Sequence, residues 1–259
     1  MSDPAASAAP FFILGCPRSG TTLLRDLLRQ HPALACPEET HFFRWPEPFG
    51  SGSYASRLID NDVLRRHREL DGIDEQSFGE LLRASASKAD FCRAYMARFM
   101  AGRKPGARRW FDKTPQNVYG AALIAASMPE ARFVHIVRHP VEVVASLRLG
   151  KVIQVRSLIG ACNYWNEALE ILSILRMAVP DRVHELRYED LVSSPVERLT
   201  ELLAFVGEEF VPEHFTLPDM RPSSHHGDPV LSEAERARVV RRCWEGMQRH
   251  GYTAEGWLP

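Results

Sequence analysis

The segment GCPRSGTTLL, which begins at Gly15, has the spacing of a phosphate-binding loop but departs from it at one position. Gly15, Gly20 and Thr22 satisfy the nucleotide-binding pattern G-x-x-x-x-G-K-[ST]. Thr21 stands where that pattern has the lysine that contacts β- and γ-phosphates. Arg18 supplies a positive charge from within the loop, on a planar fork that can bind two oxygens. The pattern predicts a site for one terminal phosphate-like group; the alternative is a Ser/Thr-rich helix cap without a ligand.

Two elements must position this loop. Residues 10–15 (PFFILG) form a continuous apolar run, which predicts a strand buried on both faces of a parallel sheet. Leucines then recur at helical spacing until Pro32, which is expected to end a helix. A phosphate-binding loop requires this order of strand, loop and helix, because the helix adds its positive end and its free N–H groups.

Further apolar runs predict three more strands, at residues 108–113, 131–137 and 182–188. Helical patterns follow the last two, including one helix over 189–206 ended by Gly207. We therefore predict an α/β protein, a three-layer α/β/α P-loop-type fold with a central parallel sheet. Ligands of such folds gather at the carboxyl ends of the strands.

The chain is expected to form one domain over residues 1–259, with a disordered tail over 1–9. Residues 45–107 carry few strand signals and predict a helical insertion near the acceptor site. Residues 216–231 are rich in Pro, Ser, Gly and His and predict a surface loop. One closing helix is expected from Ser232, which has the residue type of a helix cap.

The composition excludes several classes of protein. The 32 basic and 33 acidic residues leave a net charge of −1, which argues against a nucleic-acid partner. Five cysteines without C-x-x-C spacing argue against a zinc site and favour a reducing compartment. No apolar run approaches the ~20 residues that span a bilayer, and the start of the chain does not look like a signal peptide. We expect a cytoplasmic protein without a membrane span or a metal.

Four ordered blocks of the chain resemble sulfotransferases that use 3′-phosphoadenylyl sulfate (PAPS). PRSGTTLL (17–24) resembles their 5′-phosphosulfate-binding loop, and FVHIVRHPVEVVASLR (133–148) resembles their 3′-phosphate-binding segment. LRYEDLVSSPVERLTELLAFVG (186–207) resembles the strand and helix that follow. RSGTTLLRDLLRQHPALACPEETHFF (18–43) is similar to tyrosylprotein sulfotransferases and related bacterial sulfotransferases.

The resemblance implies which residues bind the nucleotide. It assigns the 3′-phosphate to Arg138 and Ser146 and a nucleotide contact to Tyr188. Without the resemblance, Arg138 is equally well an ion-pair partner, Ser146 a small packed residue and Tyr188 a packed ring. The loop residues assigned to the 5′-phosphosulfate are Arg18, Ser19, Gly20, Thr21 and Thr22. Arg221, Ser223 and Ser224 fall where the family has a loop over the nucleotide, but the local sequence departs from that pattern.

Glu39 is the candidate general base, because sulfuryl transfer to an alcohol requires a group that accepts the hydroxyl proton. The resemblance places Glu39 on the family's catalytic glutamate. His41 is the second candidate base, and Glu38 is interpreted as a capping or solvating acid. Lys113, at the end of a predicted strand, matches the family's second cation. With Arg18 it would stabilise charge in the transition state.

The sequence thus favours a sulfotransferase that passes a sulfuryl group from PAPS to an acceptor hydroxyl and releases adenosine 3′,5′-bisphosphate. The expected acceptor is a phenol or tyrosine, a sugar or a small metabolite. Two alternatives remain. A P-loop small-molecule kinase would need a lysine in place of Thr21. A non-catalytic nucleotide-binding module would not need Glu39 and Lys113.

Overall fold

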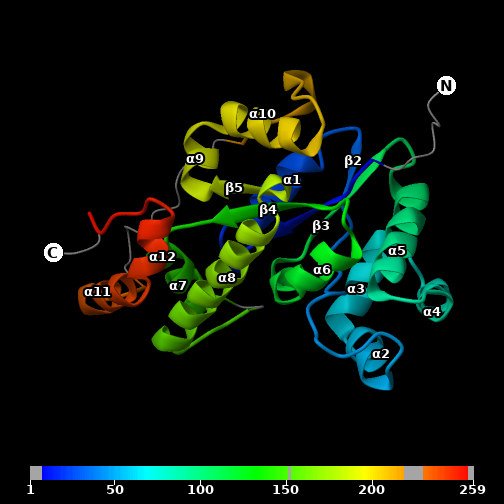
Figure 1. Ribbon diagram of the computed structural model, residues 1–259, viewed down its shortest axis with the longest axis horizontal. Helices are drawn as coiled ribbons and strands as arrows, with labels where there is room; N and C mark the ends of the chain where they lie inside the picture. Colours follow the sequence, from blue (N-terminus) through cyan, green and yellow to red (C-terminus); the bar gives the residue numbers. More distant parts are fainter. Residues whose placement is uncertain (1–7, 151–152, 219–229, 256–259) are drawn as a thin grey trace. The chain divides into compact units, whose positions relative to one another are not determined.

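The computed structural model of the chain describes residues 8–150, 153–218 and 230–255, in which strands and helices alternate (Figure 1). The strands are β1 (Phe11–Leu14), β2 (Leu34–Ala35), β3 (Arg109–Lys113), β4 (Arg132–Val137) and β5 (Val183–Arg187). The α-helices are α1 (Thr21–Leu28), α2 (Gly52–Ile59), α3 (Asp62–Asp71), α4 (Glu75–Ala84), α5 (Lys88–Arg103), α6 (Ala121–Ser127), α7 (Pro140–Leu149), α8 (Leu158–Ala178), α9 (Tyr188–Ser193), α10 (Pro195–Val206), α11 (Glu233–Arg242) and α12 (Trp244–Arg249). Short 3₁₀ helices are η1 (Pro115–Gly120), η2 (Pro180–Arg182) and η3 (Pro212–His214).

The strands belong to one five-stranded sheet in the order β2-β3-β1-β4-β5. Strand β3 pairs in parallel with β1, with Phe11 opposite Phe111, and in parallel with β2, with Leu34 opposite Arg109. The predicted α/β fold with a central parallel sheet is confirmed. The four apolar runs correspond to β1, β3, β4 and β5, whereas β2 is too short to leave a sequence pattern.

The chain divides into two compact units, which we call unit 1 and unit 2 and describe separately. Unit 1 holds β1 to β3 and α2 to α6, and unit 2 holds α7 to α12 and β5. Their ranges are Met1–Leu14, Thr22–Val134 and Val211–Thr216 for unit 1, and Gly15–Thr21, His135–Phe210 and Leu217–Pro259 for unit 2.

The core of unit 1 is aromatic. The rings of Phe11 and Phe111 stack across β1 and β3 with centroids 4.7 Å apart, and both strands are buried throughout. Residues 45–107 hold the four helices α2 to α5, which gather together in Figure 1. The residue before each of these helices accepts a hydrogen bond from a backbone N–H of the first turn, which fixes where the helix begins.

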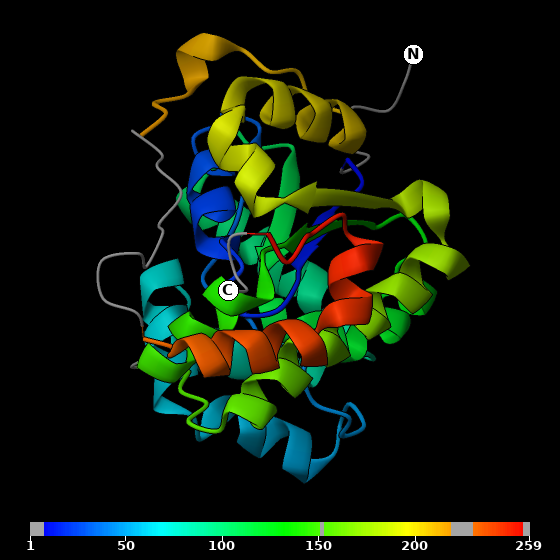
Figure 2. The same cartoon turned by 90° about the vertical axis from the view of Figure 1, so that its left-hand side faces the viewer.

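The core of unit 2 surrounds Trp165 of α8. Figure 2 shows α11 (orange) and α12 (red) beside the green and yellow-green α7 and α8. Side chains of all four helices form one buried cluster, and Cys16 of the loop after β1 belongs to it. Apolar burial of this kind stabilises a helix pair by about 25 cal/mol for each Å² removed from water.

Two predicted helices are each divided in the structure. The helix expected over 189–206 breaks into α9 and α10 because Pro195 cannot continue a helix and instead begins α10. The closing helix breaks at Cys243, whose backbone leaves the helical region where it packs in the core. Its start was predicted correctly, since the Ser232 side chain accepts a hydrogen bond from the backbone N–H of Glu235.

Some expectations concern residues outside the described part of the chain. They are most of the tail over 1–9 and most of the loop over 216–231, including Arg221, Ser223 and Ser224. Of the helices in the described ranges, none has the length and apolar character that crossing a membrane requires.

Candidate active site

The loop after β1 depends on glycine at two positions in unit 2. Gly20 has φ of +91°, and a Cβ there would lie 2.2 Å from the ring of Tyr188. A Cβ on Gly15 would lie 2.6 Å from the carbonyl oxygen of Ile136. Any side chain at these positions would push the loop away from β4 and α9, so the glycines allow this close approach.

Arg18 is held at the tip of the loop in an uncommon conformation. Its φ is +76°, and among the described non-glycine residues only His41 also has a positive φ. The exposed Arg18 donates a hydrogen bond from Nε to Oγ of Ser146, 2.8 Å away. No carboxylate in the described ranges pairs with its guanidinium. Backbone strain of this kind is concentrated at binding and catalytic sites.

Arg138 joins the same cluster. It is buried, its guanidinium lies 4.4 Å from the centre of the Tyr188 ring, and its Nη1 donates to the carbonyl oxygen of Arg18 over 3.4 Å. Nη2 also donates to Glu142 over 3.0 Å. The structure therefore brings together Arg18, Arg138, Ser146 and Tyr188 in unit 2 and shows that Arg138 has an ion-pair partner as well.

The other loop residues contribute hydroxyl groups. Ser19 is buried, and within the described structure its Oγ has no hydrogen-bond partner. Thr21 is the first residue of α1 and is buried, whereas Thr22 is exposed. A buried hydroxyl without a partner costs free energy, so Ser19 is a candidate for a ligand contact.

Glu189 makes two hydrogen bonds beside this cluster, and the sequence analysis missed it. One carboxylate oxygen accepts from the backbone N–H of His139 at 2.9 Å, and the other from the hydroxyl of Tyr252 at 2.7 Å. Because Glu189 follows Tyr188 and His139 follows Arg138, the hydrogen bond between Glu189 and His139 links the backbone beside Tyr188 to the backbone beside Arg138. The only available signal was its place directly after Tyr188.

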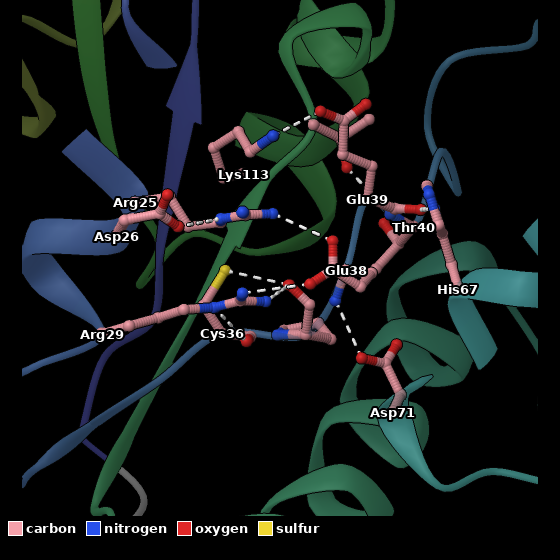
Figure 3. Close-up of polar contacts among 12 residues, drawn as sticks. Arg25, Asp26, Arg29, Cys36, Glu38, Glu39, Thr40, His67, Asp71 and Lys113 are labelled. Atoms are coloured by element: carbon pink, nitrogen blue, oxygen red, sulfur yellow. Dashed lines mark hydrogen bonds and ion pairs between the residues drawn. The ribbon is translucent and has the colours of Figure 1, made fainter. Parts of the chain in front are cut away.

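Unit 1 holds the candidate base and the second cation (Figure 3). Lys113, the last residue of β3, is 3% exposed and donates from Nζ to Oε1 of Glu39. Nε2 of His41 lies 3.4 Å from Oε2 of the same carboxylate. The structure therefore brings Glu39, His41 and Lys113 together, and Lys113 is not a solvated surface lysine.

The electrostatics of this group favour an ionised Glu39. Burial alone would raise its pKa, but the hydrogen bond from His41 and the charge of Lys113 outweigh burial and lower the pKa to about 2. Burial lowers the pKa of His41 more than Glu39 raises it. His41 has φ of +58°, and its buried Nδ1 has no hydrogen-bond partner in the part of the chain that the structure describes.

A buried network fixes the backbone around Glu39 to β3. Thr40 donates from its hydroxyl to Asp112, and its backbone N–H donates to Oγ1 of Thr114 over 2.9 Å. Asn117 also donates to Asp112, over 3.2 Å. Burial raises the pKa of Asp112 to about 6. Because Asp112 precedes Lys113, the network sets the separation of Lys113 from Glu39.

The carboxylate of Glu38 is held in ion pairs, whereas the sequence analysis interpreted Glu38 as a capping or solvating acid. Its carboxylate pairs with Arg25 at 2.9 Å and Arg29 at 3.0 Å, on the side away from Glu39 in Figure 3. Its backbone N–H donates to Asp71 of α3 over 2.8 Å. Helix α3 thereby positions the chain just before the candidate base.

A second residue of α3 bonds to Glu39 itself. Nδ1 of His67 lies 3.0 Å from the carbonyl oxygen of Glu39, and Asp71 stands one helical turn further on. Tyr95 of α5 donates to Asp71 over 2.6 Å. The sequence analysis missed these three residues because a helical pattern alone does not show what its polar face touches.

Comparisons with known proteins identify the family and the fold. The model of the sulfotransferase family matches residues 10–212. Protein-tyrosine sulfotransferase 1 of Danio rerio is 28% identical over 201 residues, which are 75% of this chain and 52% of that protein. The chain spans about half or less of the length of the curated relatives it matches.

Two solved structures show the same fold. The sulfotransferase domain of the olefin synthase of Synechococcus PCC 7002 has a TM-score of 0.66 at 23% identity and covers all of this chain and 99% of its own. Mouse sulfotransferase SULT7A1, solved with PAP, has a TM-score of 0.50 at 12% identity over 94% of this chain and 86% of its own.

Proposed function

The chain belongs to the sulfotransferase family, and on that premise we propose that it transfers a sulfuryl group from PAPS to an acceptor hydroxyl. The observation that carries the proposal is Arg18, which is fixed in a left-handed conformation at the tip of a glycine loop and bonds to Ser146. An exposed guanidinium on a strained backbone, with no carboxylate partner among the described residues, is a group prepared for an anion.

The cluster in unit 2 fits a nucleotide with two separate anionic groups. Arg18 and the loop N–H groups would bind the 5′-phosphosulfate, with the free hydroxyl of Ser19 as a further donor. Arg138 and Ser146 would bind the 3′-phosphate. Mouse SULT7A1, which shares the fold, was solved with PAP, the bisphosphate that such a donor leaves behind.

The cluster in unit 1 fits the acid–base half of the reaction. Glu39 would accept the proton of the acceptor hydroxyl while the oxygen of that hydroxyl forms a bond to sulfur. The bond from sulfur to the phosphate oxygen of the donor breaks at the same time. Lys113 and Arg18 would stabilise the negative charge that develops on the sulfuryl and bridging oxygens. His41 would orient Glu39 through the 3.4 Å contact.

The ion pair between Lys113 and Glu39 controls how strong a base Glu39 is. While Lys113 donates to Glu39, the carboxylate is a weak base with a pKa of about 2. If Lys113 turns to an oxygen of the donor, the carboxylate loses a counter-charge and its pKa rises. Glu39 would then become a stronger base only once the donor is bound.

The acceptor class is proposed from the relatives. The Danio rerio relative is named for tyrosine in proteins, so a phenolic hydroxyl is the first acceptor to test, before sugars and small metabolites. Transfer of ³⁵S from labelled PAPS to a phenol, a sugar panel and a tyrosine peptide would test the proposal. We expect label in at least one acceptor, equal in the presence of EDTA.

Two outcomes of the same assay would contradict the proposal. Transfer of ³²P from γ-labelled ATP with Mg²⁺, in place of transfer from PAPS, would identify a kinase. Binding of PAPS without transfer to any class would identify a nucleotide-binding module. A thermal-shift measurement with adenosine 3′,5′-bisphosphate separates the two, because only a ligand that binds the folded state raises Tm.

A further inference from the structure

Two of the five free cysteines, Cys162 and Cys243, meet in the core of unit 2. Cys162 lies near the start of α8, and Cys243 is the corner between α11 and α12, which Figure 2 shows beside α8. Both are 1% exposed or less. The residues next to them, Asn163 and Arg242, are hydrogen-bonded to each other, and each thiol shifts the pKa of the other, which places the two thiols in contact.

A cavity of about 320 Å³ leads to Cys162. It opens between the start of α8 and the last turns of α11, and its walls combine apolar and cationic side chains. Apart from Cys162, the lining residues are Leu158, Ile159, Arg238, Arg241 and Arg242. In the described part of the chain, Arg238 and Arg241 have no carboxylate partner, so the cavity presents positive charge to whatever enters it. Only a small molecule reaches a sulfur as buried as this one.

The surroundings make the two thiols unequal. The hydrogen bond from Cys243, helped by the charges of Arg242 and Arg238, lowers the pKa of Cys162. The same hydrogen bond, together with burial, raises the pKa of Cys243. A thiolate beside arginines, with a second thiol in contact, has the features of a cysteine that reacts with peroxides and is then resolved as a disulfide.

We propose that a hydroperoxide enters this cavity and oxidises Cys162, which then forms a reversible disulfide with Cys243. The Cys162 thiolate attacks a peroxide oxygen, the O–O bond breaks, and a sulfenic acid and hydroxide result. The Cys243 sulfur then attacks the sulfenic sulfur, the S–O bond breaks, and water leaves. Overall, two thiols lose two electrons and two protons, and hydrogen peroxide is reduced to two waters.

Helices α8 and α11 are held together by hydrogen bonds next to the two cysteines. Oδ1 of Asn163 accepts from Nε and Nη2 of Arg242 at 3.2 and 3.1 Å. Asn166 donates to the carbonyl oxygen of Arg242 over 3.0 Å. These bonds join α8 and α11 directly beside the two cysteines, so the two helices are tied together next to the pair of thiols.

Two other cysteines serve as internal controls. Cys16 belongs to the same buried cluster, but it does not line the cavity, and burial raises its pKa. Cys92 of unit 1 is fully buried, and burial raises its pKa as well. Both should stay reduced under conditions in which Cys162 reacts.

The test is oxidation of the full chain with hydrogen peroxide, followed by denaturation, alkylation and peptide mapping. We expect Cys162 and Cys243 to lose alkylation together, at least about tenfold faster than Cys92, with an intact mass about 2 Da lower and recovery in dithiothreitol. In Cys243→Ser, we expect a sulfenic acid on Cys162 that dimedone traps. In Cys162→Ser, Cys243 should react no faster than Cys92.

Two results would overturn the proposal. One is loss of alkylation at Cys162 and Cys243 no faster than at Cys92. The other is a disulfide between Cys16 and Cys243. The wild-type peptide map decides between these outcomes without the variants, so a variant that fails to fold leaves the test intact. The outcome is also independent of sulfuryl transfer, because neither Cys162 nor Cys243 is among the residues assigned to the proposed site.

Discussion

Units 1 and 2 each contribute a charged cluster, and the two clusters balance their charges differently. In unit 1 the carboxylate of Glu39 and the ammonium of Lys113 neutralise each other. In unit 2, Arg138 is paired with Glu142, but Arg18 bonds only to a hydroxyl and has no carboxylate partner in the described residues. The difference leads us to expect that an anionic ligand completes the cluster in unit 2, whereas the cluster in unit 1 already holds its counter-charge.

The largest expected effect falls on turnover and comes from unit 1. Glu39→Gln removes the proton acceptor but keeps the size of the side chain, so the single-turnover rate should fall by about 10²–10⁴-fold. Affinity for adenosine 3′,5′-bisphosphate should stay unchanged. Glu38→Gln is the matched control and should cost much less, because the Glu38 carboxylate is bound to Arg25 and Arg29.

His41 tests whether the base is assigned correctly. If His41→Ala abolishes turnover while Glu39→Gln stays near the wild-type rate, histidine is the base. The pH profile of kcat/KM for PAPS gives the same decision, since it reports pKa values of the enzyme without bound donor. With Glu39 as base and its pKa about 2, kcat/KM should have no acid limb between pH 5 and 7. With His41 as base, kcat/KM should have an acid limb at a pH below the usual histidine value of about 6.5, because burial lowers the pKa of His41.

The next effect falls on nucleotide affinity and comes from unit 2. Arg138→Ala should weaken the binding free energy of adenosine 3′,5′-bisphosphate by roughly 2–4 kcal/mol, the range for losing one partner of a buried charged contact. Adenosine 5′-phosphosulfate, which has no 3′-phosphate, should lose much less affinity. Arg148→Ala is the control in α7, the helix that follows Arg138, because Arg148 pairs with Glu235. Equal weakening of both nucleotides would make Arg138 purely structural.

The ion pair in unit 1 should also appear in the pH dependence of stability. The folded-state pKa of Glu39, about 2, lies below the usual glutamate value of about 4.3. The pair therefore stabilises the fold fully above about pH 4.3, and this stability is lost as the pH falls towards 2. The free energies of unfolding of the wild type and Glu39→Gln in urea should therefore approach each other by the order of 1–3 kcal/mol as the pH falls through this window. Parallel curves would contradict the ion pair.

The smallest effect tests how helix α3 positions the base. Asp71→Asn weakens the acceptor of the Glu38 backbone N–H, and we expect kcat to fall about tenfold through misplacement of Glu39. Bisphosphate affinity should stay unchanged. Asp74→Asn, the same substitution at the cap of α4, is the control. A loss of stability at Asp71→Asn with unchanged kcat would show that α3 does not position Glu39.

The sequence predicted the fold and most of the residues that gather in the two charged clusters, because their signals come from short segments of the chain. Buried strands leave continuous apolar runs, and Gly20, Arg18 and Thr21 have types that only a loop at a helix start explains. The divided helices show the limit: Cys243 gives no sequence signal for a break caused by packing. His67, Asp71 and Glu189 were missed because their roles depend on contacts between residues far apart in the chain.

The most direct test of the central claim is calorimetric titration of the wild type, Arg138→Ala and Glu39→Gln with adenosine 3′,5′-bisphosphate, and separately with ATP and Mg²⁺. The account predicts that the bisphosphate binds the wild type and Glu39→Gln alike, binds Arg138→Ala weakly, and binds far more tightly than ATP. Binding of ATP with Mg²⁺ at least as tight as that of the bisphosphate, or bisphosphate affinity that depends on Glu39 and not on Arg138, would contradict it.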